Sequence, residues 1–337
     1  MNSNSGKRRK FSGLSGAELQ IAHDALVRLK QTFIMEESDD QTDPSDESTG
    51  PTFDVQIDEM ITMMENKLHE NSQVFAEFLQ YDHGTLEAFN ITQAGILLLK
   101  PYSKERLTSS RSLGENSFWS SKNFNLQLEL LKNLIPRTNE ACARVWIDTF
   151  FFRASAMLPP AQRMVLNLEQ EIPATTVKPL GRTTLSGFVD YTVVVTNRVA
   201  AATLFQIPTL TTIKMLSCSG FFVIEAKIND PGKHIAQAVC EIYTCGKYLG
   251  KQILRGTLTN GSDWIFIIVR INADSNGASF SYSSPISSSA GIIHPDGNVL
   301  KLGNDWSDIV AGILYHWINN SFSDIDHDDW IKEVTVI

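Results

Sequence analysis

Apolar residues recur with two different periods along this 337-residue chain, and the short runs without helical periodicity predict strands. The clearest run is FFVIEAK at residues 221–227, which is typical of a strand buried on both faces. A second strand is predicted over residues 185–195, where Gly187 opens an aromatic and β-branched run that Asp190 interrupts. Residues 256–269 are predicted to form two strands joined by an Asn-Gly turn.

Helical periodicity separates these strands. Pro136 and Thr138 are start signals for a long helix over about 139–157, and a turn signal at 230–232 precedes a helix over 233–243. Residues 273–304 are expected to form strands with loops, and residues 306–322 an amphipathic closing helix. This alternation predicts an α/β fold, in which helices flank a central mixed sheet.

The first 135 residues show a different pattern. Residues 1–54 are expected to be a largely disordered tail, with one amphipathic helix at 15–35 and an acidic linker at 36–53. Residues 55–135 are predicted to be a mostly helical N-terminal region that docks on the sheet domain or binds a protein partner. The sheet domain then spans residues 136–337, with its core at 137–272.

Charged side chains interrupt one of these predicted strands and stand at the end of the other. Residues two apart on a strand share a face, so Glu225 and Lys227 project together from the end of an apolar run. Asp190 joins them if the two strands are neighbours, and two close carboxylates repel unless a cation lies between them. A few hard oxygen ligands suit Mg²⁺ or Mn²⁺. The alternative is an ordinary surface salt bridge between Glu225 and Lys227.

The order of these elements resembles the PD-(D/E)XK nuclease superfamily, and within it the fungal and oomycete subgroup that includes the nuclease domains of Crinkler-type effectors. The resemblance covers residues 137–272, somewhat under half the chain, and implies a restriction-endonuclease-like fold. The residues that carry it are Asn139, Glu140, Arg144, Gly187–Tyr191, Val223–Lys227, Ala236, Gln237, Glu241, Gly256–Gly261 and Trp264. Two departures are Val189, where the superfamily has proline, and an insertion at about 197–219, expected to be a hairpin or a loop over the site.

The resemblance implies a role for each candidate catalytic residue. Asp190 and Glu225 would bind the metal together with the backbone carbonyl of Ala226, and Lys227 would position the attacking water and stabilise charge on the phosphate. Glu140 would reach the metal shell from its helix, and Gln237 would orient the Glu225 or Lys227 region. Two simpler interpretations stay open: the acid at 140 complements the helix dipole, and the amide at 237 is solvated.

Composition limits the partners. The net charge of −9 opposes binding to nucleic acid, yet seven of the acids lie between residues 36 and 47. Basic residues around the core are candidates to line a phosphate path, or else ordinary solubilising charges: Lys214, Lys233, Lys247, Lys251 and Arg255. Four cysteines without zinc-ligand spacing, no apolar leader and no membrane-spanning run predict an intracellular protein. The basic cluster at residues 7–10 is consistent with a nuclear signal or with a solubilising tail.

These observations predict a Mg²⁺- or Mn²⁺-dependent nuclease, and the resemblance favours DNA over RNA as its substrate. Paired cuts in a duplex would favour a homodimer. The alternative is a catalytically idle nuclease fold that acts as an effector through protein or nucleic-acid binding. A structural protein with a chance E-x-K triplet is a third interpretation, and it predicts no metal affinity.

Overall fold

The computed structural model describes residues 75–77, 83–101, 104–178, 183–216, 218–228, 231–287, 291–293 and 299–335, with isolated helical positions at 25, 26, 30, 57 and 60–62. The chain divides into two compact units, Met1–Val74 and Phe75–Ile337, and the second contains all the elements considered below. The expectations for the basic cluster at 7–10 and for the acidic linker at 36–53 lie outside the described residues.

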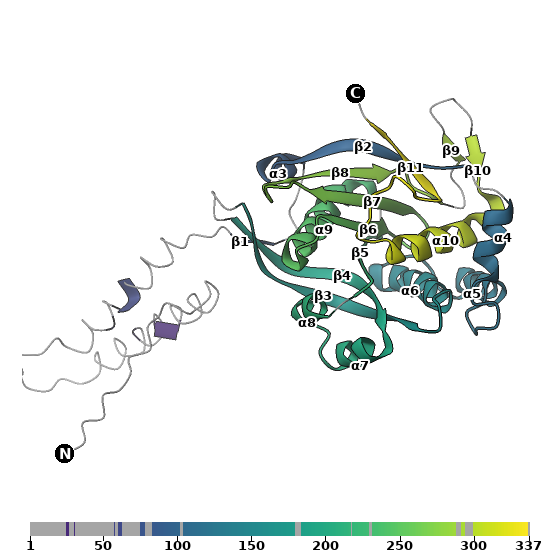
Figure 1. The fold of residues 1–337 in the computed structure, drawn as a ribbon, viewed down its shortest axis with the longest axis horizontal. Helices are drawn as coiled ribbons and strands as arrows, with labels where there is room; N and C mark the ends of the chain where they lie inside the picture. Colours follow the sequence, from purple (N-terminus) through teal and green to yellow (C-terminus); the bar gives the residue numbers. More distant parts are fainter. Residues whose placement is uncertain are drawn as a thin grey trace, which may run out of the picture. The chain divides into compact units, whose positions relative to one another are not determined.

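One mixed sheet of nine strands runs through the described part of the second unit (Figure 1). Its order is β1–β4–β5–β6–β7–β8–β2–β11, and β3 pairs with β4 off this path. The strands are β1 (Phe75–Glu77), β2 (Ile91–Leu99), β3 (Gln162–Lys178), β4 (Thr183–Asn197), β5 (Gly220–Ala226), β6 (Ile253–Thr259), β7 (Trp264–Ile271), β8 (Ala278–Ser283) and β11 (Ile331–Thr335). A separate small hairpin pairs β9 (Gly291–Ile293) with β10 (Val299–Lys301).

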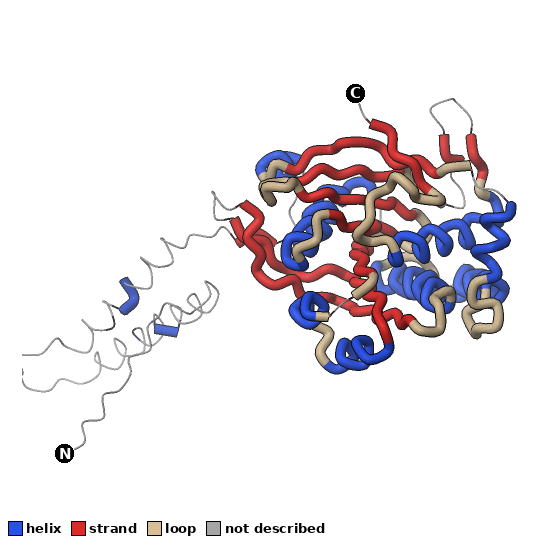
Figure 2. The backbone as a smooth tube through the Cα atoms, viewed as in Figure 1, coloured by secondary structure: helices blue, strands red, loops and turns tan. Residues whose placement is uncertain are grey.

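Helices cover both faces of this sheet, as Figures 1 and 2 show, so the unit has three layers. The first face carries α4 (Lys104–Ser112), α5 (Ser121–Leu134), α6 (Glu140–Ala156) and α10 (Trp306–Asn319), the last preceded by η4 (Gly303–Asp305). The second face carries α3 (His83–Ala88), α7 (Arg198–Gln206), α8 (Leu210–Met215) and α9 (Ile235–Leu249), the last preceded by η3 (Pro231–His234). Every residue of β5 is buried, as expected for a strand covered on both sides.

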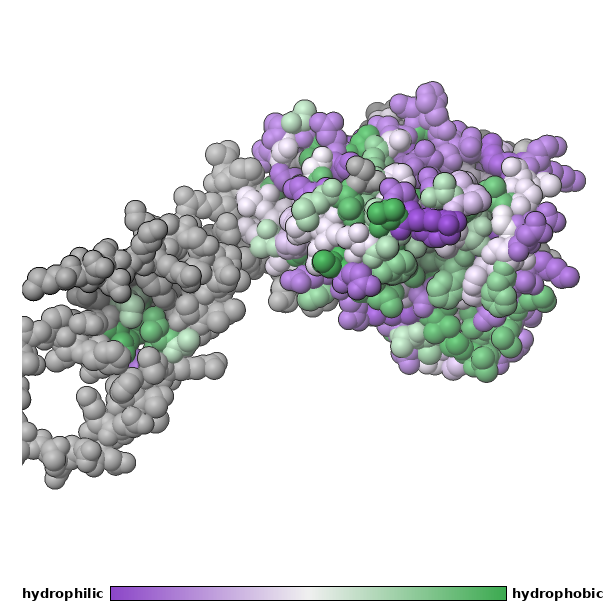
Figure 3. All heavy atoms as spheres, turned by 60° about the horizontal axis from the view of Figure 1, so that its bottom comes forward, coloured by the Kyte–Doolittle hydropathy of each residue, from purple (hydrophilic) through white to green (hydrophobic). Residues whose placement is uncertain are grey.

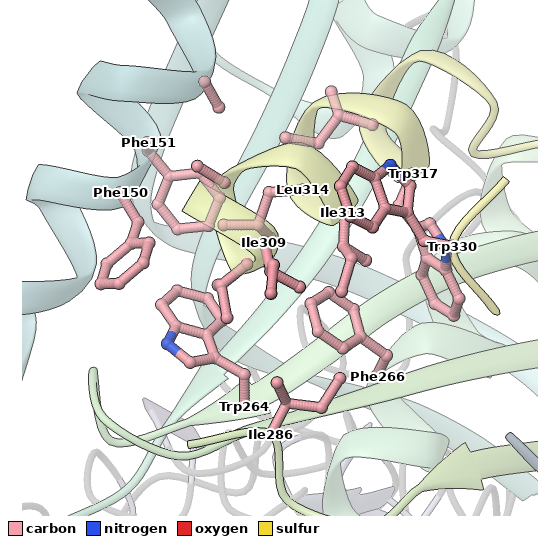
Figure 4. Packing of buried hydrophobic residues seen from close by; sticks show 14 of the residues in the cluster. Phe150, Phe151, Trp264, Phe266, Ile286, Ile309, Ile313, Leu314, Trp317 and Trp330 are labelled. Carbon is pink, nitrogen blue, oxygen red and sulfur yellow. The ribbon is translucent and has the colours of Figure 1, made fainter. Parts of the chain in front are cut away.

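Aromatic side chains fill the layer between the sheet and the first group of helices (Figure 4). The ring of Phe150 on α6 lies 4.8 Å from that of Trp264 on β7, and Phe266 lies 5.2 Å from Trp317 on α10. Helix α6 begins where the sequence predicts, because the side chain of its N-cap Asn139 accepts a hydrogen bond of 2.9 Å from the third helical amide. This packing fixes the start of α6 against the sheet.

Strand pairing sets the positions of the predicted charged residues. Strands β4 and β5 are antiparallel, with Tyr191 opposite Ile224. The same register puts Asp190 opposite Glu225, one step farther along, and opposite residues of an antiparallel pair project from the same face. Strand β5 is parallel to β6, and α9 is the crossover that joins them.

Three segments differ from the sequence-based expectations. Residues 75–77 and 91–99, in the region predicted to be mostly helical, form β1, which pairs with β4, and β2, which pairs with β8 and β11, so the sheet begins before residue 136. A short apolar run does not distinguish a strand from a buried helix, and here pairing with distant strands decides. The insertion at 197–219 is the helix pair α7–α8, and not a hairpin or loop.

Some apolar side chains of the described chain remain uncovered. One group lies on and near α5 and α6 and consists of Phe118, Leu126, Leu130, Leu134, Val145 and Phe152. The other lies on and near α7 and α8 and consists of Val199, Phe205, Ile207 and Met215. Figure 3 shows hydrophobic side chains gathered low on the face that it presents. Among the described helices, none is both long and apolar enough to cross a bilayer.

Candidate active site

The predicted acids and base meet where β5 ends, beside the middle of β4 and the start of α9. The Lys227 ammonium lies 2.5 Å from Oε1 of Glu225, and the side chain of Glu225 is only 3% exposed. The backbone N–H of Ala226 donates a hydrogen bond of 2.7 Å to Oδ2 of Asp190. Residues from two strands, 35 positions apart in the chain, thus form one contiguous cluster.

Helix α9 supplies a buried amide and a further carboxyl group. Nε2 of Gln237 donates to Oε1 of Glu225 at 2.6 Å and to Oε1 of Glu241 at 2.9 Å. Gln237 and Glu241 are one helical turn apart, so both side chains reach the same strand end. The amide therefore bridges the two carboxyl groups, and the Glu225 side chain is held between α9 and Lys227.

Helix α6 reaches the cluster through Arg144. Nη2 of Arg144 lies 2.6 Å from Oδ1 of Asp190 and 3.0 Å from Oε1 of Glu140, and Nη1 lies 3.0 Å from Oε1 of Glu169. Burial works to lower the pKa of Arg144, but the three acids outweigh it and raise the pKa. Glu140, the first residue of α6, is thus linked to Asp190 through the guanidinium.

The electrostatics of the cluster are dominated by buried carboxyl groups. Burial, and then the charge of Asp190, raise the pKa of Glu225 to about 7, although Lys227 opposes the change. Burial and the Glu225 charge raise the pKa of Glu241 well above its ordinary value. Burial lowers the pKa of Lys227, but the attraction of Glu225 is stronger and raises it. Lys227 is therefore cationic at neutral pH, and the Glu225–Glu241 pair retains a proton.

Glu169 is a residue of this network that the sequence did not reveal. It lies on β3, which pairs with β4 so that Leu168 is opposite Tyr191 and Gln170 is opposite Val189. Its φ of 51° lies in the left-handed region that non-glycine residues rarely adopt. The buried side of β3 changes here from odd positions to even ones, and the sequence pattern does not show this change because the flanking buried residues, Asn167 and Gln170, are polar.

One candidate phosphate ligand is not available. Arg255 on β6 is 1% exposed, and its NH1 atom lies 2.7 Å from Oδ2 of the equally buried Asp328. Its guanidinium also lies over the Trp317 ring, 4.8 Å from the centroid. The expectation that Arg255 lines a phosphate path is therefore wrong, because β6 directs it into a buried ion pair.

The other basic candidates are spread along α9. Lys233 lies in η3, just before the helix that presents Gln237 to the cluster. Lys247 comes ten residues after Gln237, or about 15 Å farther along the helix axis, and Lys251 follows the helix end. Lys214, on α8, is exposed and packs over a tyrosine near that far end. These lysines do not form one patch around the carboxylates.

Comparison with protein-family models finds no match for this chain, and a search of curated proteins finds no match either. No known family therefore supports the site, and the support for it comes from the geometry of this chain. Among the described residues, no group of three or more His, Cys, Asp or Glu side chains is arranged to hold a metal ion.

Proposed function

We propose that this protein is a metal-dependent nuclease of the PD-(D/E)XK type, which hydrolyses phosphodiester bonds and acts on DNA more than on RNA. The observation that supports it best is the meeting of Asp190, in the middle of β4, with Glu225 and Lys227 at the end of the paired strand β5. Charged groups at a core edge are costly, so their retention together is more readily explained by a ligand than by stability. The preference for DNA comes from the resemblance alone.

The donor set fits a small, hard divalent cation. Asp190 and Glu225 offer carboxylate oxygens, and burial beside Asp190 already raises the pKa of Glu225, so a cation there would relieve the repulsion. Oε2 of Glu241 is also buried and has no hydrogen-bond partner among the described residues. Mg²⁺ and Mn²⁺ tolerate few protein ligands, because water and phosphate oxygens complete their shells. Asp190, Glu225 and the Ala226 carbonyl would hold the ion, with Glu140 at its outer shell.

Each residue of the cluster has a role in this proposal. When bound, the cation would offset charge on the phosphate and activate a water molecule. Lys227, kept cationic by Glu225, would bind a phosphate oxygen and stabilise the charge that develops on it. Gln237 holds Glu225 in one orientation, and Arg144 does the same for Asp190. Both supports come from helices packed on the sheet, which favours a preorganised site.

A second function, binding without turnover, is favoured because the carboxylate oxygens of the same cluster already have partners within the protein. Both oxygens of Asp190 already accept hydrogen bonds, from Arg144 and from the Ala226 amide. Oε1 of Glu225 accepts from Gln237 and contacts Lys227. In that case the cluster would be a fixed structural element of a nuclease-like effector, and the protein would act through its surfaces.

The test is cleavage of supercoiled plasmid, single-stranded DNA and RNA with Mg²⁺, Mn²⁺ or EDTA. We expect metal-dependent cleavage that Asp190→Ala, Glu225→Ala and Lys227→Ala each abolish. Lys132→Ala is the matched control, since Lys132 is an exposed lysine whose ion pair among the described residues is with Glu129 on its own helix. Cleavage that survives all three substitutions would refute this site. A wild-type protein that cleaves none of these substrates would favour the binding function.

A further inference from the structure

A second recess lies directly beside the candidate active site. It has a volume of about 260 Å³ and lies between the residues that open α6 and the β6–β7 turn, with Arg137, Asn139, Ile228 and Ser262 in its wall. Ile228 follows Lys227 in the chain, and the Lys227 amide donates to the Thr259 carbonyl at 2.9 Å, at the end of β6. The wall of the recess is thus continuous with the strand end that carries the catalytic candidates.

Arg137 is held in a fixed orientation at this recess. Its guanidinium lies over the ring of Trp146, 3.8 Å from the centroid, and the Trp146 side chain is buried in the core. Burial lowers the pKa of Arg137 and Asp263 acts against it, but an arginine stays charged. Because stacking uses the flat face of the guanidinium, its edge, which carries the N–H donors, remains available to a ligand.

The opposite wall is a rigid turn. Oδ1 of Asn260 accepts hydrogen bonds from the amides of Ser262 at 2.9 Å and Asp263 at 2.8 Å. Gly261, with φ of +81°, lies so close to α6 that a Cβ atom there would come within 2.6 Å of Cβ of Trp146. The turn therefore packs against the same tryptophan that supports Arg137, and the recess is preformed.

The unused polar groups of the recess are mostly hydrogen-bond donors. The Ser262 hydroxyl is buried and has no hydrogen-bond partner among the described residues. Asn139 uses its side-chain oxygen to cap α6, which leaves its NH₂ group as a donor. The one acid, Asp263, accepts from the Asn260 amide at 3.0 Å through Oδ2. An arginine edge, a hydroxyl and an amide NH₂ are the donor set that binds phosphate oxygens of a nucleic-acid backbone.

We propose that this recess is a subsite for a backbone phosphate of nucleic acid, next to the phosphate that faces Lys227. The proposal rests on the proposed function for the identity of the ligand. It assigns Arg137 as the main contact and Ser262 and Asn139 as supporting donors. It also explains how a chain with a net charge of −9 would bind a polyanion, by a local and preorganised contact near the cluster.

The experiment measures binding of fluorescently labelled single-stranded and duplex DNA oligonucleotides to the full chain in EDTA, so that no metal-dependent cleavage occurs. Affinity is measured over a range of salt concentrations for wild type, Arg137→Ala and Arg137→Lys. The control is Arg163→Ala, because Arg163 is an exposed arginine that, in the part of the chain that the structure describes, bonds backbone carbonyls at the start of β3. Thermal unfolding of each variant establishes that it is folded.

We expect Arg137→Ala to weaken binding roughly tenfold, as for loss of one charged hydrogen bond. The slope of log affinity against log salt should fall by about one, which a merely structural defect would not cause. Arg137→Lys should keep the slope and lose part of the affinity, since lysine cannot form the planar contact. An unchanged slope in Arg137→Ala, an equal change in Arg163→Ala, or no binding by wild type would each overturn the subsite. Arg137-dependent binding by a wild-type protein that cleaves none of the substrates with Mg²⁺ or Mn²⁺ would refute the nuclease and leave the subsite standing.

Discussion

Replacing Glu225 by glutamine should remove a pH dependence of stability that the fold builds into this carboxyl group. Its pKa is about 7, against an ordinary value of 4.5, because it is buried beside Asp190. The folded protein therefore keeps a proton that the unfolded chain releases, and the free energy of unfolding falls as pH rises from about 4.5 to about 7. At about 1.4 kcal/mol per pH unit, the loss is about 3 kcal/mol. The amide does not titrate, so Glu225→Gln should lack this loss.

Urea denaturation at pH values from 4.5 to 8 measures the effect. The difference in the free energy of unfolding, variant minus wild type, should rise by about 3 kcal/mol across this range. Glu241 adds to this change. The charge on Glu225 is one of the causes that raise the pKa of Glu241, and this cause is absent in Glu225→Gln. Glu129→Gln, on the exposed surface of α5, controls for the loss of an acid as such. Parallel pH profiles for wild type and Glu225→Gln would refute the reasoning.

Adding Mn²⁺ to the same experiment connects stability with the proposed metal site. A cation bound by Asp190 and Glu225 must displace the retained proton, so it binds the folded protein better at high pH. Mn²⁺ should therefore stabilise wild type more at pH 8 than at pH 5, and should have little effect on Glu225→Gln. Equal stabilisation of both proteins would mean that any metal binds elsewhere.

Two further predictions concern the framework around the site. Arg255→Ala should lower the free energy of unfolding by about 3–5 kcal/mol, because it leaves the Asp328 carboxylate buried without its cation; a loss below about 1 kcal/mol in urea denaturation would contradict this. Gly261→Ala should cost at least about 1 kcal/mol more than Gly250→Ala, since both have positive φ but only the first would clash, with Trp146; equal losses would contradict the clash.

The local sequence was sufficient to predict an element where that element carries its own start signals or apolar pattern. The helix at α6 follows from its start signals, and the structure begins it at Glu140 after an Asn139 cap. The strand β5 follows from an unbroken apolar run, and the charges at its end follow from the two-residue repeat of strands. These local rules were enough to bring Glu225 and Lys227 together, although not to show which helices would support them.

What the sequence could not show depends on pairing between distant segments. Strand β3 pairs with β4 along nearly its whole length, so its position is set by its partner. Glu169 enters the network only because its backbone turns at the point where β3 passes Asp190. Arg255 looked like a surface cation because its buried partner, Asp328, lies 73 residues farther along the chain.

The charge balance of the cluster bears on the choice between turnover and idle binding. Among the described residues, the cluster contains two cations, Arg144 and Lys227. These face five carboxyl groups, those of Glu140, Glu169, Asp190, Glu225 and Glu241. One retained proton still leaves an excess of negative charge, which a purely structural cluster would gain stability by losing. A cation supplied from outside and held by Asp190 and Glu225 would remove that excess. The metal-dependent part of the stability is therefore the quantity that distinguishes the two functions.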